Sequence, residues 1–218
     1  MTLDIANMHL DTPKSLKHEA AAALWRAELG AAHVSALVSF VGALRREKGA
    51  NYQIPYFDPF DAGIEAECLF LLEAPGPQAK GSGFVSRNNP DETAKNFLEL
   101  TMKIGIPRSR TATWNVVPWY VSKGSRIRPV NQKDIIEARP SLLRLLGLLP
   151  KLRIVALVGR KAASVESWLS ESMPELQVFT TAHPSPMFVN RAPVKNRELL
   201  HQQFTTIAVA LNAHVYDA

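Results

Sequence analysis

The sequence predicts an α/β protein, a three-layer α/β/α sandwich around a central, mainly parallel four-stranded sheet. Four runs of strand length carry little polar alternation, which is expected where both faces of a parallel sheet are covered. Stretches of helical spacing separate these runs, and such alternation is typical of a sheet with helices on both faces. With 218 residues and 46% hydrophobic content, the chain is long enough for one core. We therefore expect one domain over 1–218, with a helical extension at 1–50 packed on it.

The N-terminal half begins with helix. Residues 14–47 are rich in Ala and Leu at helix-like spacing, so we expect one long helix or two that separate near Gly30. The segment 51–63 holds two prolines and several aromatic residues, which favours a loop on the surface. The apolar run 67–72 is the first expected strand, and a helix with two acidic residues in its first turn follows at 91–103.

The C-terminal half continues the alternation with a strand at 111–117. The helical stretch 132–149 contains Pro140, which removes a helical hydrogen bond, so this helix is expected to be kinked or in two pieces. The remaining elements follow in order: a strand at 152–158, a helix at 162–170, a strand at 176–181 and a helix at 195–211.

Composition narrows the classes of function. Lys and Arg number 25 against 20 Asp and Glu, and the net charge of +5 suits a polyanionic partner without requiring one. Cys68 is the only cysteine, which excludes an intrachain disulfide and a four-cysteine zinc or iron–sulfur site. Residues 1–13 lack the apolar run of a secretory signal, and no segment approaches the roughly 20 apolar residues of a membrane span. We expect a cytoplasmic monomer with no membrane partner.

Three unusual segments follow or end the expected strands. They are 73–83 after the first strand, 115–120 on the second and 183–191 after the last. In parallel sheets the ligand binds in the crevice outside the carboxyl ends of the strands. The sequence therefore predicts that these segments meet in one site.

The last of these segments begins with His183, in the run His-Pro-Ser-Pro. Its two prolines fix φ and stiffen the backbone that presents the imidazole. The apolar pair Met187 and Phe188 follows and is suited to wedge into a base stack, while Arg191 is suited to bind a phosphate. The alternative is an ordinary turn with a surface histidine.

The other two segments also allow a structural and a functional interpretation. In the first, the glycines on either side of Ser82 let the backbone approach a ligand, and the bulky ring of Phe84 follows them in the sequence. The alternative is a structural turn followed by a core phenylalanine. In the second, Asn115 stands among apolar residues at a strand end. A buried amide must satisfy its donor and acceptor, so Asn115 either binds a ligand or hydrogen bonds to a neighbouring loop.

Together the motifs EAPG at 73–76, GFV at 83–85, NVV at 115–117 and HPSP at 183–186 resemble those of the uracil-DNA glycosylase superfamily. The resemblance covers about residues 67–200 and is to bacterial branches with an EAPG motif. It implies an enzyme that flips uracil out of single- or double-stranded DNA and hydrolyses the N-glycosidic bond. We expect no metal or cofactor in this chain.

The resemblance also implies roles for individual residues. Phe84 would stack on the extruded uracil, Asn115 would read its N3 and O4 edge, and His183 would contact O2. The amide of asparagine can accept from N3–H and donate to O4, whereas cytosine presents the opposite pattern. Ala74, Gly76 and Gln78 would line the base pocket. The expected DNA contacts are Ser82, Ser86, Ser185, Met187, Phe188, Asn190 and Arg191, with Met187 or Phe188 as the wedge.

The chain departs from the best-known branch at the position that holds the attacking water. That branch carries an aspartate where this chain has Ala74, and Glu73 lies one residue earlier, on the opposite side of an extended strand. Glu73 is the favoured catalytic substitute. The other candidates are Gln78, Asn88, Asn89 and a backbone carbonyl.

Two further departures concern substrate range and cofactor. Gly76 replaces a tyrosine that blocks the methyl group of thymine, so either Phe57 or Tyr56 supplies the block or 5-substituted uracils are tolerated. EAPG branches commonly hold a four-cysteine iron–sulfur cluster, which a single cysteine excludes. The resemblance is therefore to a relative without the cluster.

Three alternatives stay open. A protein that binds uracil-containing or single-stranded DNA without cleaving it is favoured by Ala74. A glycosylase for hypoxanthine or xanthine would use Asn115 to read a purine edge. An unrelated α/β nucleotide enzyme ranks last, because the chain lacks a phosphate-binding glycine fingerprint.

Overall fold

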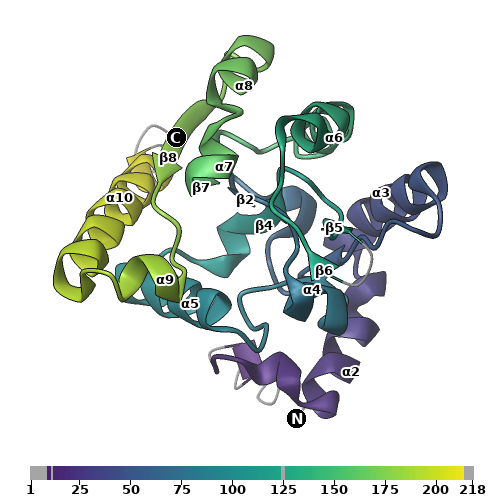
Figure 1. The fold of residues 1–218 in the computed structure, drawn as a ribbon, viewed down its shortest axis with the longest axis horizontal. Coiled ribbons are helices and arrows are strands. Elements are labelled where there is room, and N and C mark those ends of the chain that lie inside the picture. The colour runs from purple at the N-terminus through teal and green to yellow at the C-terminus, as the bar shows by residue number, and fades with distance from the viewer. Residues whose placement is uncertain (1–8, 11, 124–125, 214–218) are drawn as a thin grey trace.

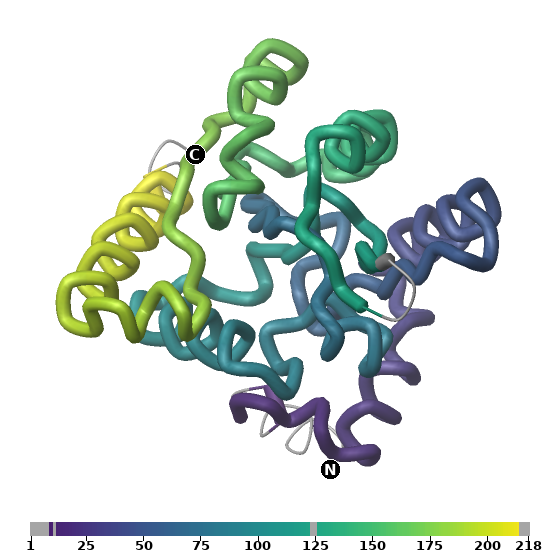
Figure 2. The backbone as a smooth tube through the Cα atoms, in the orientation of Figure 1, coloured from purple at the N-terminus to yellow at the C-terminus, as the bar shows by residue number. Residues whose placement is uncertain are grey.

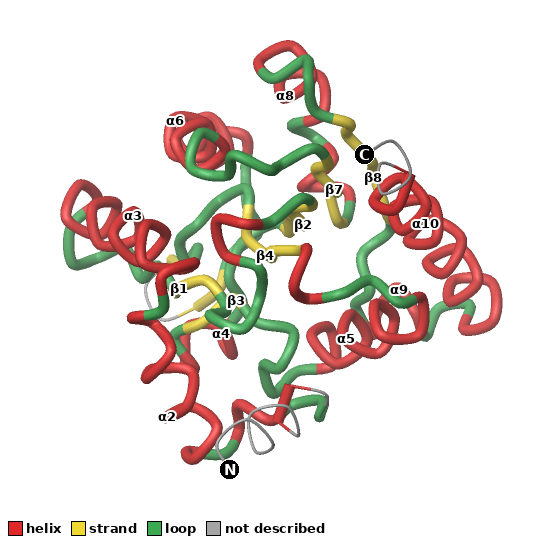
Figure 3. The backbone as a smooth tube through the Cα atoms, turned by 180° about the vertical axis from the view of Figure 1, so that it is seen from behind, coloured by secondary structure: helices red, strands yellow, loops and turns green. Residues whose placement is uncertain are grey.

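Four parallel strands form the centre of the protein, in a computed structural model that describes residues 9–10, 12–123 and 126–213. The strands are β2 (Cys68–Leu72), β4 (Thr111–Asn115), β7 (Ile154–Val158) and β8 (Gln177–Thr181), in the order β4-β2-β7-β8. Figure 3 shows the strands in succession with the helices outside them. The predicted fold class and central sheet are confirmed.

Helices cover both faces of this sheet (Figure 1). One layer contains α3 (Ala32–Lys48) and α6 (Gln132–Leu146), and the other contains α5 (Glu92–Ile104) and α10 (Pro193–Ala213). Because side chains alternate along a strand, Leu69 and Leu71 of β2 join the first core, while Cys68 and Phe70 join the second. The strand is apolar throughout because it has no solvent-facing side. Burial raises the pKa of the Cys68 thiol to about 12, which matches an inert core cysteine.

The N-terminal helices are separated at the expected glycine. The segments η1 (Ser15–Lys17), α2 (Glu19–Ala27) and η2 (Glu28–Gly30) precede α3, and the chain turns by 93° between Gly30 and Ala32. Figure 2 shows this part of the chain as the purple and blue edge of the molecule. Within the described residues, no single helix has the length and apolar composition to span a membrane, although the bent pair passes that test jointly.

Some elements differ from the expectation. Pro140 lies inside one continuous α6, so of the two expected forms the division into two pieces is wrong, and the helix expected at 162–170 is divided into α7 (Arg160–Ala163) and α8 (Glu166–Ser172). The segment 51–63 is mostly loop packed on the core, but it also contains β1 (Tyr56–Phe57), and Phe57 is buried with its ring stacked 3.7 Å from that of Trp114. The other aromatic residues of the segment, Tyr52, Tyr56 and Phe60, are partly buried and pack against the cores.

Several short elements were not predicted, because two to six residues carry too little periodicity. They are η3 (Gly63–Glu65), α4 (Pro77–Ser82), β3 (Phe84–Val85), η4 (Arg108–Arg110), β5 (Ser122–Lys123), β6 (Arg126–Ile127) and α9 (Pro186–Val189). Strand β3 pairs in parallel with β1, and β5 pairs antiparallel with β6. All except η3 and η4 lie in or next to the predicted functional segments.

Candidate active site

A cavity of about 650 Å³ opens at the carboxyl edge of the sheet. The turn after β2, the segment after β3, the end of β4 and the loop after β8 all contribute to its wall. The three predicted segments therefore meet, because parallel strands bring their carboxyl ends to one edge. Residues 127–130, which are the last residue of β6 and the three residues after it, form a further wall that the sequence did not indicate.

Asn115 is the last residue of β4 and lies opposite Leu72 of β2. It is 3% exposed, lines the cavity, and its Nδ2 has no hydrogen-bond partner. Buried amide donors are almost always paired. The alternative interpretation requires a hydrogen bond from this amide nitrogen to a neighbouring loop, and the structure shows no such bond.

His183 lines the same cavity from the loop after β8. Two long helices hold that loop: Asn96 Nδ2 of α5 donates to Pro184 O at 2.9 Å, and Ala182 N donates to Gln203 Oε1 of α10 at 2.8 Å. The backbone on both sides of the histidine is thus fixed by the scaffold as well as by the prolines. The imidazole is presented from a rigid loop.

Gly159 leaves the space that this imidazole occupies. It follows β7 with a φ of 91°, and its N–H donates to Thr181 O at 2.8 Å. A Cβ at this position would lie 3.0 Å from the Cβ of His183 and 3.1 Å from its Cδ2. Both the backbone conformation and the close approach require glycine here.

Burial lowers the pKa of His183 below its usual value of 6.5. The ring is therefore neutral at pH 7 and donates through one nitrogen only. A neutral imidazole can therefore stabilise developing negative charge through its N–H, without first being protonated to imidazolium.

The lowered pKa of His183 has a consequence for stability. In the unfolded chain the ring binds a proton near pH 6.5, whereas the folded protein resists protonation until a lower pH. The contribution of His183 to the free energy of unfolding should therefore be fully present above about pH 6.5 and be lost as the pH falls through the folded-state pKa. Chemical denaturation at about pH 8 and about pH 5 should show that the free energy of unfolding decreases more for the wild type than for His183→Gln. An identical loss in both proteins would contradict a lowered pKa.

The remainder of the HPSP segment forms α9. Ser185 caps this short helix by accepting from the N–H of Phe188, and Met187 is 85% exposed. Phe188 instead packs against the α5–α10 core, and its carbonyl accepts from Asn196 Nδ2 at 2.6 Å. Of the two predicted wedge residues, Met187 has the exposed side chain, whereas Phe188 is partly buried; the wedge itself remains a prediction.

Asn190 and Arg191 follow α9 and are both exposed. They flank the apolar tip of the loop, in the same short stretch of chain as Met187. This position leaves their predicted phosphate contacts available. The contacts themselves remain a prediction.

The turn after β2 supplies the next wall. Glu73 lines the cavity, and its Oε1 accepts from the N–H of Val130 at 3.3 Å. Val130 O in turn accepts from Lys161 Nζ at 2.9 Å. Glu73 therefore holds the 127–130 wall while its carboxylate faces the cavity.

The three other predicted pocket residues of this turn also line the cavity. Ala74 is half-buried against the larger core, Gly76 precedes the first turn of α4, and Gln78 is exposed on that helix. A Cβ at Gly76 would meet nothing within 4 Å. The glycine thus leaves open space on the cavity side of the turn.

Neither aromatic candidate closes this space. The ring of Phe57 stacks on Trp114, and the ring of Tyr56 lies under the guanidinium of Arg45, 4.0 Å from its Cζ. Neither side chain lines the cavity. The prediction that Phe57 or Tyr56 blocks 5-substituents is wrong, because both rings are held in other contacts.

Three further site predictions are wrong. Phe84 is 1% exposed and packs in a cluster with Trp25 of α2, so it offers no face to a base; its neighbour Val85 lines the cavity instead. Ser82 donates to Asn89 Oδ1 at 2.7 Å, and the buried Ser86 donates to Asp58. Both hydroxyls are used inside the protein rather than for phosphate contacts.

The two asparagine candidates for holding water have structural partners. Asn88 Nδ2 donates to the carbonyls of His9, Leu10 and Thr12, which ties down the N-terminal segment. Asn89 Nδ2 donates to Phe84 O at 2.9 Å. Of the side chains that the sequence suggested for holding the attacking water, Glu73 and Gln78 remain as candidates.

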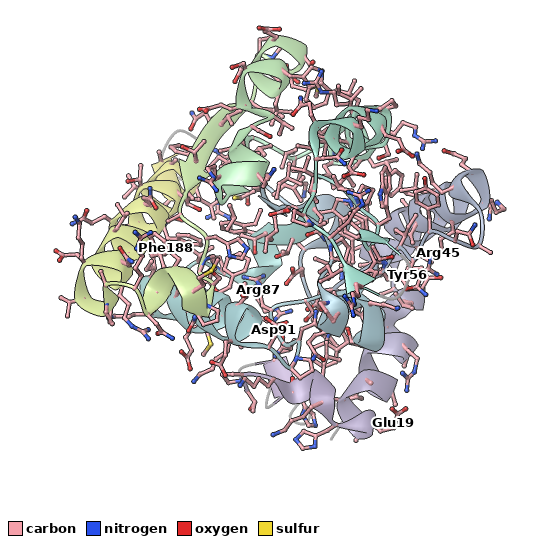
Figure 4. The ribbon with its side chains drawn as sticks, viewed as in Figure 1. Glu19, Arg45, Tyr56, Arg87, Asp91 and Phe188 are labelled. Atoms are coloured by element: carbon pink, nitrogen blue, oxygen red, sulfur yellow. The ribbon has the colours of Figure 1, made fainter. Side chains whose placement is uncertain are left out.

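The sequence analysis missed five polar residues that line the cavity: Arg87, Asp91, Thr93, Thr113 and Arg128. Asp91 caps α5 by accepting from Ala94 N at 2.9 Å, and burial raises its pKa. Figure 4 shows Arg87 and Asp91 between α4 and α5. The polar run Ser-Arg-Asn-Asn-Pro-Asp directly after β3 was the available signal. No three His, Cys, Asp or Glu side chains gather as metal ligands within the described part of the chain.

Comparison with known proteins identifies the family of this chain. No protein with curated functional data matches the chain. Wild-type SMUG2 from Pedobacter heparinus has a similar crystal structure, with a TM-score of 0.56 and 12% identity over 82% of this chain and 85% of that one. The solution structure of a "putative Uracil DNA glycosylase" from Methanosarcina acetivorans has a TM-score of 0.46 and is 19% identical, over 66% of this chain and 92% of that one. Residues 55–207 match the family described as the Uracil DNA glycosylase superfamily. The chain therefore belongs to the uracil DNA glycosylase superfamily.

Proposed function

We propose that this DNA glycosylase excises uracil from DNA by flipping the nucleotide out and hydrolysing its N-glycosidic bond. Membership of the superfamily supports a DNA glycosylase. The preference for uracil rests on one observation: the buried, unpartnered Nδ2 of Asn115 at the wall of the cavity. With the amide in this orientation, Nδ2 donates to O4 of uracil and Oδ1 accepts from N3–H. Cytosine presents a donor where uracil has O4.

His183 acts on the leaving group. As the C1′–N1 bond breaks, its electron pair moves onto the base and positive charge develops on the sugar. A neutral imidazole that donates to O2 binds the departing base more strongly than the intact nucleotide, so it lowers the barrier. The lowered pKa of His183 suits this role, because the donor is in the same neutral form across the neutral pH range.

Glu73 orients the attacking water, whose oxygen bonds to C1′ while a proton passes to the carboxylate. Its position in the cavity wall supports this role. Outside the cavity, Met187 would fill the gap left by the flipped nucleotide, since an inserted apolar side chain recovers part of the unstacking cost. Ser185, Asn190 and Arg191 would contact the flanking phosphates.

One gel experiment tests the proposal. Labelled single- and double-stranded oligonucleotides that contain uracil, hypoxanthine, xanthine or thymine are incubated with the protein and then cleaved with alkali. We expect strand breaks at uracil that disappear with Asn115→Ala and weaken with His183→Ala. Binding without breaks would support the non-catalytic alternative, and breaks only at hypoxanthine or xanthine would support the purine alternative. No product on any substrate would overturn the enzyme.

Glu73→Ala should lower the rate of uracil excision at least tenfold, because a general base contributes about 10²–10⁴ to such rates. Single-turnover kinetics measure the effect. Glu73→Gln separates two explanations, since its amide oxygen can still accept from Val130 N–H but cannot take a proton. If glutamine restores the wild-type rate, Glu73 only supports the wall; if alanine leaves the rate unchanged, Glu73 has no role in the mechanism.

Gly76→Tyr should make the enzyme more selective against 5-substituted uracils. A ring at this position can extend into the open space that the structure leaves there, so excision of 5-hydroxymethyluracil should fall at least about tenfold relative to uracil, the discrimination typical of steric exclusion in a pocket. Gly81→Tyr is a matched control, because Gly81 also lies in open space, on the helix α4 that follows Gly76, but outside the cavity. If the wild type already refuses 5-hydroxymethyluracil and thymine, the pocket is not roomy.

A further inference from the structure

The mouth of the cavity is mostly apolar. The residues that line the cavity and are also exposed are Pro77 and Gln78 on α4, and Ile127 and Pro129 on the wall 127–130. A residue with both properties lies where the cavity meets solvent. Ile127 is 56% exposed, and of the exposed large apolar side chains in the described part of the chain it is the one that lines this cavity. An apolar side chain at the opening of a ligand site is suited to contact the ligand.

The wall that carries Ile127 is fixed to the rest of the protein. The next residue, Arg128, donates to both carboxylate oxygens of Asp134, at 2.6 and 2.7 Å. Val130 is buried in the larger core and donates its N–H to Glu73 Oε1 at 3.3 Å. Ile127 is therefore followed by a braced segment that keeps its side chain at the mouth.

Ile127 and Met187 are exposed apolar side chains in different places. Met187 does not line the cavity, whereas Ile127 does. In Figure 1, α9, which carries Met187, and β6, which ends with Ile127, lie apart with β4 between them. An apolar side chain outside the cavity can meet the base stack of the duplex, whereas one at its mouth can meet the nucleotide that has left the stack.

The lining offers no exposed phenylalanine, tyrosine or tryptophan ring among the residues that the structure describes. Phe97 lines the cavity but is 2% exposed, and Phe84 does not line it. Ile127 is therefore the largest exposed apolar side chain with which a nucleotide in the cavity can pack.

We propose that Ile127 packs against the flipped nucleotide at the mouth of the cavity and stabilises its extrahelical state. The proposal rests on the proposed function. The base turns its polar edge inward to Asn115 and His183, so the C–H surface of the deoxyribose and the adjoining face of the ring are left at the mouth. Packing against Ile127 removes this apolar surface from water. The contact is the same before and after the glycosidic bond weakens, so it contributes to binding and not to the chemical step.

Ile127→Ala should weaken binding of a single-stranded oligonucleotide that contains 2′-fluoro-2′-deoxyuridine about five- to tenfold, as expected when about half of an isoleucine side chain is no longer buried. The fluorine withdraws electrons from the sugar and slows cleavage, so fluorescence anisotropy can measure the binding at equilibrium. An oligonucleotide with cytosine at that position should bind equally to both proteins. In excision of uracil, KM should rise by the same factor with kcat nearly unchanged.

Ile136→Ala is the matched control, because Ile136 is 53% exposed on α6 but lies outside the cavity. It should bind and cleave like the wild type, and Tm checks the fold of each variant. Ile127→Leu keeps the apolar volume, so its binding should stay within about twofold of the wild type. Met187→Ala should lower excision more from a duplex than from a single strand, whereas Ile127→Ala should lower both by the same factor.

Two outcomes would overturn the inference. If folded Ile127→Ala binds the fluorinated oligonucleotide like the wild type, or if its loss is confined to the duplex, Ile127 does not contact the flipped nucleotide. A wild type that cleaves no uracil-containing DNA refutes the proposed function instead, and the binding comparison then still tests Ile127. A wild type that also binds the fluorinated oligonucleotide no better than the cytosine one overturns both.

Discussion

His183→Gln should lower the rate of uracil excision about 10²–10³-fold, the cost of removing one donor aimed at a developing oxyanion. The neutral imidazole reaches the cavity from a loop that α5 and α10 hold in place. Glutamine keeps a polar side chain of similar length but does not fix its N–H in the same position. Because O2 gains charge only as the bond breaks, kcat should fall with little change in KM.

The measurement is single-turnover excision from a uracil-containing duplex, with the fold of the variant checked by its Tm. His201→Gln is a suitable control, since His201 lies on α10 outside this cavity. It should leave the rate unchanged. A His183→Gln protein that is folded and fully active would remove the imidazole from the leaving-group step.

The sequence was sufficient to predict the sheet, because local information determines it. The strands β2 and β7 are apolar at every position. This pattern is typical of a strand whose two faces are both covered, since a strand with a solvent-exposed face alternates with polar residues. The carboxyl edge then follows from the parallel order, and with it the meeting of Glu73, Asn115 and His183 in one cavity. These residues needed no knowledge of side-chain packing to be selected.

By contrast, the sequence could not predict which residue of the two-residue strand β3 faces the cavity. Phe84 and Val85 are both apolar, and which of them faces the cavity depends on α2, whose Trp25 packs in the cluster that contains Phe84. That contact joins residues far apart in the sequence. A family resemblance transfers the motif but not this packing, which explains why the stacking role of Phe84 was wrong.

The buried charges were missed for a similar reason. Arg87 reads as a surface residue in the sequence, since arginine is almost never fully buried unless it is paired. Its partners Asp61 and Thr111 come from two other segments, and only the folded chain brings them together. The polar half of the cavity is therefore a product of tertiary structure, whereas its edge is a product of strand order.

Gly159→Ala should lower activity about 10²-fold, although the new methyl group touches no substrate. The substitution has two effects: it forces alanine into a backbone with φ 91° and ψ 162°, and it places a Cβ 3.0 Å from that of His183. The first effect should cost about 1–3 kcal/mol of stability. The second must displace the imidazole, and a misplacement of about 1 Å can cost 10²-fold in rate.

Gly49→Ala separates these two effects. Gly49 has nearly the same backbone, with φ 82° and ψ 173°, but a Cβ there would meet nothing within 4 Å. Both variants should therefore unfold at a lower Tm than the wild type, while only Gly159→Ala loses excision when both are assayed well below their Tm. Equal activity in the two variants would mean that the His183 loop can move aside without loss, and the rigid presentation of the imidazole would then have no catalytic importance.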